Sequence, residues 1–157
     1  PSIYENLSVF ENLEMSYPAG RKVFGALFFK RSADVIARVE EVAAEIGLAD
    51  QLHDEAGLLS HGQKQWLEIG MLLMQEPELL MLDEPVAGMS VSERAQTAEL
   101  LKRISQGRSV LVIEHDMEFV KSIAHRVTVL HQGRLLAEGS MEAVQKNPKV
   151  VEVYLGH

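Results

Sequence analysis

The hydrophobic pattern of the chain changes near Pro77. Before Pro77, apolar residues recur every three or four positions, which predicts amphipathic helices. After it, short continuous apolar runs bounded by breakers predict strands buried on both faces of a parallel sheet, with helices between them. The pattern therefore predicts a helical subdomain over residues 1–76, followed by an α/β part over residues 77–157.

Start and stop signals give the individual elements. Ser-x-x-Glu and Ser-x-x-Gln capping boxes open several helices, and glycine or proline follows their ends. Residues 21–31 have no clear period, so a loop is expected there. Helices are predicted at residues 9–17, 32–46, 61–76, 90–105, 117–124 and 140–146 and in the tail from 148, and strands at residues 79–83, 109–114, 126–131 and 134–138.

Two acids mark the end of the first predicted strand. Asp83 closes the apolar run, and Glu84 follows it immediately before Pro85. Open α/β sheets bind ligands at the carboxyl ends of their strands, so both carboxylates stand where a ligand would lie. A core strand whose acids only mark a solvated loop is the alternative, and the strand by itself leaves both interpretations open.

Two further segments carry candidate chemistry. Ser60 and Gln63 form a capping box at a helix start, where exposed N–H groups and the helix dipole favour an anion. A well-capped helix without a ligand is the alternative. His115 ends the second predicted strand, and a parallel crossover would bring it close to Glu84.

Composition limits the possible function classes. The chain has 157 residues, enough for one globular domain, and a formal net charge of −8, which argues against a general nucleic-acid binder. It contains no cysteine, which excludes disulfides and thiolate metal sites. No apolar run approaches the roughly 18 residues of a membrane span, and no signal peptide is recognisable.

Together these motifs resemble the nucleotide-binding domain of ABC transporters over the whole chain. Residues 59–63 resemble the family signature, residues 79–83 the Walker B strand and residues 87–90 the D-loop. Residues 58–90, 113–120 and 152–156 are similar to the branched-chain-amino-acid-type branch, within which the likeness is greatest to the ATP-binding subunit of urea transporters. The resemblance implies an α/β fold, an incomplete P-loop NTPase core with parallel strands and a C-terminal hairpin.

The resemblance also implies the site residues. In this family two domains enclose two ATP molecules, so the signature of one subunit faces the γ-phosphate held by the P-loop of the other. The residues implied to contact ATP in trans are Ser60, His61, Gly62 and Gln63, and those implied to form the D-loop are Ala87, Gly88, Met89 and Ser90. Asp83 is implied to bind Mg²⁺ through water, and Glu84 to activate the attacking water. His115 is implied to sense the γ-phosphate.

The chain departs from the family pattern in several places. No Gly-Lys-[Ser/Thr] occurs in it, so the Walker A motif is missing, as is the Q-loop. The chain is therefore expected to be a C-terminal portion of an ATPase subunit, inactive by itself. His61 replaces the usual glycine and Ser90 the usual aspartate; His61 either adds a donor near phosphate or is simply tolerated, and we favour the second.

The missing P-loop strand has a structural consequence. In the family fold it lies between the strand ending at Glu114 and the strand over residues 127–130. Unpaired strand edges are normally covered. We therefore expect these two strands to pair directly, or another chain to fill the gap.

The implied function is the ATP-binding subunit of an importer for urea, short-chain amides or branched-chain amino acids. Its partners would be a second ATP-binding subunit, membrane permease subunits and, indirectly, a substrate-binding protein, with no nucleic acid. Its place would be cytoplasmic, peripheral on the inner face of the cell membrane. The alternatives are a non-catalytic module that docks to membrane subunits, and the C-terminal half of a DNA-repair or chromosome ATPase.

Overall fold

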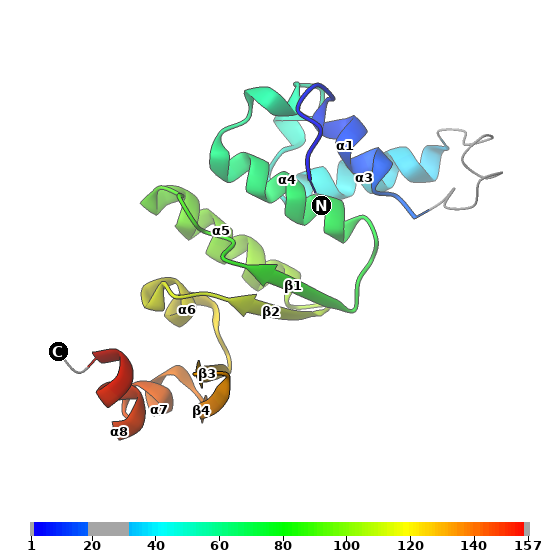
Figure 1. Ribbon diagram of the computed structural model, residues 1–157. Helices are drawn as coiled ribbons and strands as arrows, with labels where there is room; N and C mark the ends of the chain where they lie inside the picture. The colour runs from blue at the N-terminus through cyan, green and yellow to red at the C-terminus, as the bar shows by residue number, and fades with distance from the viewer. Residues whose placement is uncertain (1, 19–31, 156–157) are drawn as a thin grey trace. The chain divides into compact units, whose positions relative to one another are not determined.

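The computed structural model describes residues 2–18 and 32–155, so the loop predicted at residues 21–31 lies outside the described residues. Two compact units make up the chain, Pro1–Ile113 and Glu114–His157. Figure 1 shows their helices and strands in chain order. The division at residue 76 that the sequence suggests stays a prediction.

Helices dominate the first part of unit Pro1–Ile113. The helices α1 (Val9–Met15), α3 (Ala33–Glu45) and α4 (His61–Leu73) pack against one another, and their facing side chains form the core. Helix α1 ends two residues earlier than predicted, with Ser16 as its C-cap. Short 3₁₀ turns lie at Ala49–Gln51 and Ala56–Leu58. Fully buried members of this core are Leu13, Val39, Val42, Leu67, Ile69 and Leu73.

A βαβ crossover completes this unit. Strands β1 (Leu79–Asp83) and β2 (Ser109–Ile113) run parallel, with Leu79 opposite Ser109 and Asp83 opposite Ile113. Helix α5 (Val91–Ile104) connects them. The predicted parallel α/β arrangement is therefore confirmed, and the bounds of β1 agree with the prediction.

The prediction that β1 is buried on both faces is wrong, because only one of its faces is buried. Leu80 and Leu82 are buried, but Leu79 and Met81 on the other face are 52% and 60% exposed. Leu111 and Ile113 of β2 are likewise 47% and 56% exposed. Strands with apolar residues on both faces require a layer on each side, and within the described residues one of these layers is missing.

Unit Glu114–His157 contains a hairpin and short helices. Strands β3 (Val127–His131) and β4 (Arg134–Gly139) pair antiparallel across Gln132 and Gly133, whose φ angles of 50° and 73° are those of a hairpin turn of type I′. The predicted hairpin is confirmed. The helical segments of this unit are α6 (Met117–Ile123), α7 (Met141–Gln145), α8 (Pro148–Val150) and a π-helical turn, Val151–Leu155.

Direct pairing of β2 with β3 stays a prediction, because the two strands belong to different units. In the described part of the chain β2 pairs with β1 and β3 pairs with β4, in two separate two-stranded sheets. Filling of the gap by another chain stays a prediction.

Candidate functional site

The signature turn, residues 59–63, is built by reciprocal capping of α4. The Ser60 hydroxyl accepts a hydrogen bond from the Gln63 amide at 3.2 Å, and the Gln63 side-chain oxygen accepts one from the Ser60 amide at 2.9 Å. This is the predicted capping box. Gly62 is buried in the first turn, whereas Ser60 and His61 are exposed.

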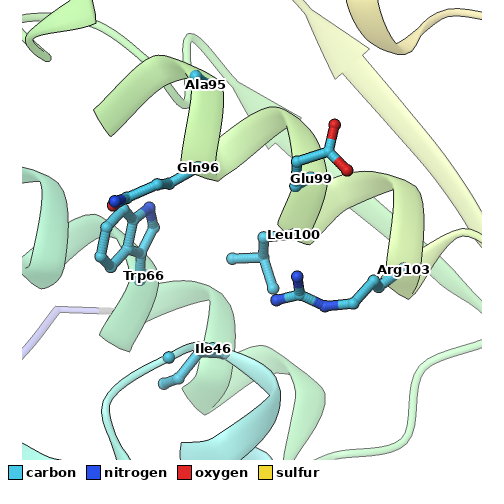
Figure 2. Close-up of a pocket in the computed structure, with 8 residues that line it drawn as sticks. Ile46, Trp66, Ala95, Gln96, Glu99, Leu100 and Arg103 are labelled. Carbon is cyan, nitrogen blue, oxygen red and sulfur yellow. The ribbon is translucent and has the colours of Figure 1, made fainter. Parts of the chain in front are cut away.

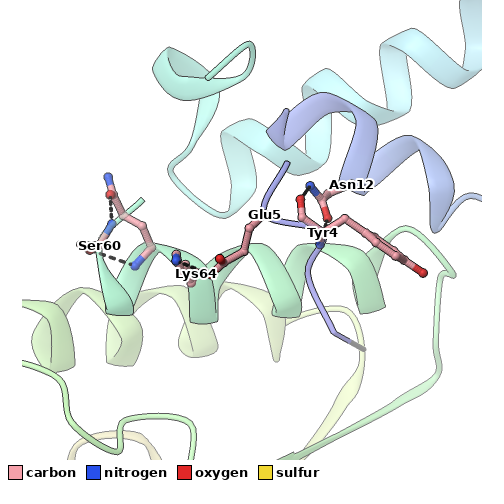
Figure 3. A network of polar contacts seen from close by, with 6 residues as sticks. Tyr4, Glu5, Asn12, Ser60 and Lys64 are labelled. Atoms are coloured by element: carbon pink, nitrogen blue, oxygen red, sulfur yellow. Dashed lines mark hydrogen bonds and ion pairs between the residues drawn. The ribbon is translucent and has the colours of Figure 1, made fainter. Parts of the chain in front are cut away.

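The N-terminal segment supports this turn from the side (Figure 3). Buried Asn12 accepts from the Tyr4 amide at 2.7 Å and donates to the Tyr4 and Ser8 carbonyls at 3.0 and 2.9 Å. Glu5, in the segment that Asn12 holds, pairs with Lys64 of α4 at 2.6 Å. Asn12 therefore holds this segment against α1, and the Glu5–Lys64 pair ties it to the signature helix α4.

The strand-end acids lie where the sequence places them. Asp83 and Glu84 are both exposed at the carboxyl end of β1. The Glu84 amide donates to the Ile113 carbonyl at 2.9 Å, and its φ of 47° is left-handed, which is uncommon for a side chain of this size. Glu76 and Gln132 share this conformation, with φ of 50° each, so it does not by itself distinguish Glu84.

The D-loop, residues 87–90, leads into the second capping box. The Ser90 hydroxyl accepts from the Glu93 amide at 3.3 Å, and one Glu93 carboxylate oxygen, Oε2, accepts from the Ser90 amide and hydroxyl at 2.9 and 2.7 Å. Met89 is buried beneath the turn. Helix α5 therefore begins immediately after the D-loop, as predicted from Ser-x-x-Glu.

His61 connects the signature turn to the D-loop. Its Nε2 lies 3.0 Å from the Ala87 carbonyl oxygen. A carbonyl can only accept, so Nε2 carries the proton in this contact. The next residue, Gly88, has a φ of 71°, and a side chain there would meet the imidazole ring at 3.4 Å. His61 thus has a specific partner in the structure.

Glu93 makes a second connection between the same segments. Its other carboxylate oxygen, Oε1, accepts from the Ser60 hydroxyl at 3.0 Å. Hydrogen bonds from the Ser90 amide and hydroxyl, and then from Ser60, hold the pKa of Glu93 below its usual value. The sequence pattern identifies Glu93 only as a local cap of α5, because no local signal reports a contact across 33 positions.

His115 belongs to the other unit. Its side chain is 78% exposed, and its amide donates to the Glu114 carboxylate at 3.0 Å. Asp116 then caps α6 by accepting from the Glu118 and Phe119 amides at 3.1 and 3.0 Å. The predicted meeting of His115 with Glu84 stays a prediction.

A separate cavity of about 460 Å³ opens between the end of α3 and the helices α4 and α5 (Figure 2). Trp66, Ile46 and Leu100 give it an apolar wall, and Glu99 and Arg103 are charged. None of the predicted site residues lines it.

The described part of the chain shows neither a clustered metal site nor a membrane helix. Over residues 2–18 and 32–155, no three His, Asp or Glu side chains gather into a metal-binding group. In the same ranges no helix has the length and apolar character to cross a membrane. A single carboxylate with water is still compatible with Mg²⁺, which keeps several waters and takes its other ligands from phosphates.

Two protein-family models match the sequence of this chain. Residues 1–87 match the model of the ABC transporter family, and residues 134–157 match the model described as branched-chain amino acid ATP-binding cassette transporter. Solved structures agree with this: MJ1267, an ATP-binding cassette of an ABC transporter, superposes with a TM-score of 0.82 at 27% identity, covering 99% of this chain and 66% of that one. The predicted fold class is confirmed.

Several relatives in sequence are named for branched-chain amino acid transport. The high-affinity branched-chain amino acid transport ATP-binding protein LivG of Escherichia coli is 32% identical, and the match covers 98% of this chain and 64% of LivG. The corresponding protein BraF of Pseudomonas aeruginosa is 36% identical, with 97% and 61% covered. The chain therefore spans less than two thirds of the length of these relatives.

Proposed function

The chain belongs to the ABC transporter family of ATP-binding proteins, and from this premise we propose that it supplies the signature turn and the D-loop to ATP held by another subunit. The observation that carries the proposal is the connection of these two segments. Through His61 and Ala87 at 3.0 Å, and Ser60 and Glu93 at 3.0 Å, one unit presents them as one assembly.

Each residue has a chemical part in this proposal. The Ser60 hydroxyl, which donates to Glu93 in this structure, exchanges that acceptor for a phosphate oxygen when it meets the opposite ATP, and the Gly62 amide donates beside it at the positive end of α4. In a subunit that also has a P-loop, Asp83 holds Mg²⁺ through water, and Glu84 orients and polarises the attacking water. His115 contacts the γ-phosphate. Catalysis of this kind depends on positioning and charge neutralisation.

The wider assignment is that of an importer subunit. We propose a second ATP-binding subunit and membrane permease subunits as partners, a substrate-binding protein as indirect partner, and a position on the inner face of the cell membrane. Branched-chain amino acids are the proposed solutes, because LivG and BraF are named for their transport. Urea specificity stays a prediction, and uptake of leucine against urea by the assembled transporter discriminates between the two.

Complementation in trans tests the central claim. A LivG-type ATPase whose own signature serine is replaced by alanine keeps its P-loop but lacks the donor for the opposite ATP. The variant alone is expected to hydrolyse ATP only slowly, and the chain alone not at all. Mixing the two is expected to restore turnover, and Ser60→Ala in the chain is expected to reduce the restored rate by about 100- to 1,000-fold, since one donor to the transferred phosphate is lost.

Ser32→Ala is the matched control. Ser32 also caps a helix, α3, by accepting from the Val35 amide, but it lies outside the signature turn. It is expected to leave the restored rate unchanged. Lack of restored turnover, or equal loss with both serine variants, contradicts the proposal and favours a non-catalytic docking module.

A further inference from the structure

A single carboxylate joins the signature turn to the D-loop. The two oxygens of Glu93 have different partners: Oε1 accepts from Ser60, 33 positions away, whereas Oε2 accepts from the Ser90 amide and hydroxyl. A capping glutamate needs only the second set of bonds. The bond to Ser60 exceeds what helix α5 requires, and it places the carboxylate between the starts of two helices.

Gly62 shows how closely Glu93 approaches α4. A Cβ atom at this position would lie 2.5 Å from Glu93 Oε1 and 2.7 Å from its carboxyl carbon. Real Cβ atoms do not come this close, so any side chain at Gly62 would displace Glu93. The need for glycine at this position of the signature turn therefore has an internal cause, in addition to access for a ligand.

His61 fixes the same two segments at a second point. Its bond to the Ala87 carbonyl lies at the beginning of the D-loop, and the bonds of Glu93 lie at its end. Two separate points of attachment prevent rotation of one segment about a single contact. The start of α4 and the whole D-loop are therefore restrained as one body.

From this arrangement we propose that Glu93 is a positioning residue, a clamp that couples the signature turn to the D-loop, with His61 as its second point. The consequence for catalysis rests on the proposed function: a shift in either segment is transmitted to the other before both meet the opposite ATP. Because the opposite P-loop grips the nucleotide, loss of the clamp is expected to lower kcat about tenfold with little change in KM for ATP.

The coupling can be measured on the chain alone, without nucleotide. Ser90→Ala removes one partner of Glu93 at the D-loop, so the amide resonances of Ser60, His61 and Gly62 are expected to shift in a ¹⁵N-labelled sample. In a Glu93→Gln background the amide group can no longer accept at both ends. In this background, the chemical-shift changes that Ser90→Ala causes at the signature turn are expected to be smaller than in the wild type by at least about threefold, because the two sites are no longer coupled.

Two further variants complete the test. Gly62→Ala, which should displace Glu93, is expected to reproduce the loss of coupling by an independent route. Glu99→Gln is the control, because Glu99 is also a glutamate of α5 but bonds to Lys102 at 2.8 Å. It is expected to leave the coupling intact.

Equal shifts at the signature turn in both backgrounds, or none in the wild type, overturn the clamp whatever the outcome of complementation. Coupling without restored turnover leaves the clamp standing and contradicts the proposed function instead. A rise in KM for ATP with kcat unchanged, in the complementation assay, overturns the assigned effect on catalysis.

Discussion

Asn12 is a buried polar side chain whose hydrogen bonds determine the course of the segment before α1. It is fully buried, and its amide group bonds to backbone groups of Tyr4, Leu7 and Ser8. Asn12→Leu is expected to lower the free energy of unfolding by about 2–3 kcal/mol, because buried backbone groups lose their partners. Urea denaturation followed by circular dichroism measures this change.

Asn6→Leu provides the control for Asn12. Asn6 is an exposed residue of the same segment. Its replacement is expected to change the free energy of unfolding by less than about 0.5 kcal/mol, as for most surface positions. Similar losses for both variants would contradict the role assigned to Asn12.

Glu93 should make stability depend on pH in the acidic range. Hydrogen bonds from Ser90, and then from Ser60, lower its pKa in the folded state. A lowered folded pKa means that the contribution is present above about pH 4.3, the unfolded value, and is lost as the pH falls through the folded value. The difference in Tm between wild type and Glu93→Gln is therefore expected to shrink on acidification.

Thermal melts at several values between about pH 3 and 6 check this expectation. The comparison of two chains differing only at Glu93 cancels the titration of other carboxylates to first order. A Tm difference that stays constant or grows as the pH falls would show that the charge of Glu93 adds no stability.

At the scale of elements, a buried hydrogen bond joins α4 to α5. The Trp66 indole nitrogen donates to the Thr97 hydroxyl at 2.8 Å, and this hydroxyl donates to the Glu93 carbonyl oxygen at 2.8 Å. Thr97→Val keeps the shape but leaves the indole N–H unpaired, at a cost of about 1–3 kcal/mol. The clamp therefore has a rigid support one turn further along both helices.

Trp66 is the single tryptophan of the chain, so its fluorescence reports directly on this contact. Thr97→Val is expected to change the emission maximum and lower the urea midpoint, whereas Thr97→Ser, which keeps the hydroxyl, is expected to retain most of both. If the serine variant behaves like the valine variant, the hydrogen bond is not what stabilises the contact.

The elements themselves were largely predictable from the sequence. Capping boxes at Ser60 and Ser90 and the strand between Pro77 and Pro85 are local signals, and the structure has the corresponding elements within a few residues. The capping role of Glu93 is local as well. Its bond to Ser60, however, depends on how α4 and α5 pack, which no pattern within either helix specifies.

The error about β1 has a physical origin. A continuous apolar run identifies a strand suited to two covering layers, but it does not say whether both layers are present. The exposure of Leu79 and Met81 follows from this. The hydrophobic pattern describes the environment that the strand is suited to, and not which other segments provide it.

At the scale of the whole molecule, one face of β1 and β2 is apolar and exposed. Its large side chains are Leu79, Met81, Leu111 and Ile113, between 47% and 60% exposed. Contiguous apolar surface of this kind is typical of interaction sites or of aggregation. We therefore expect this face to bind another polypeptide, or a second copy of the chain when no other partner is present.

Sedimentation velocity over a range of concentrations tests this expectation on the isolated chain. The wild type is expected to self-associate, and Met81→Glu with Leu111→Lys to shift it toward monomer, because charges on the face oppose its burial. Leu58→Glu is the control, as Leu58 is 79% exposed and lies outside this sheet. The expectation is contradicted if the wild type is monomeric at every concentration, or if Leu58→Glu has an equal effect. Either result would mean that this face of β1 and β2 does not have to be covered by another chain.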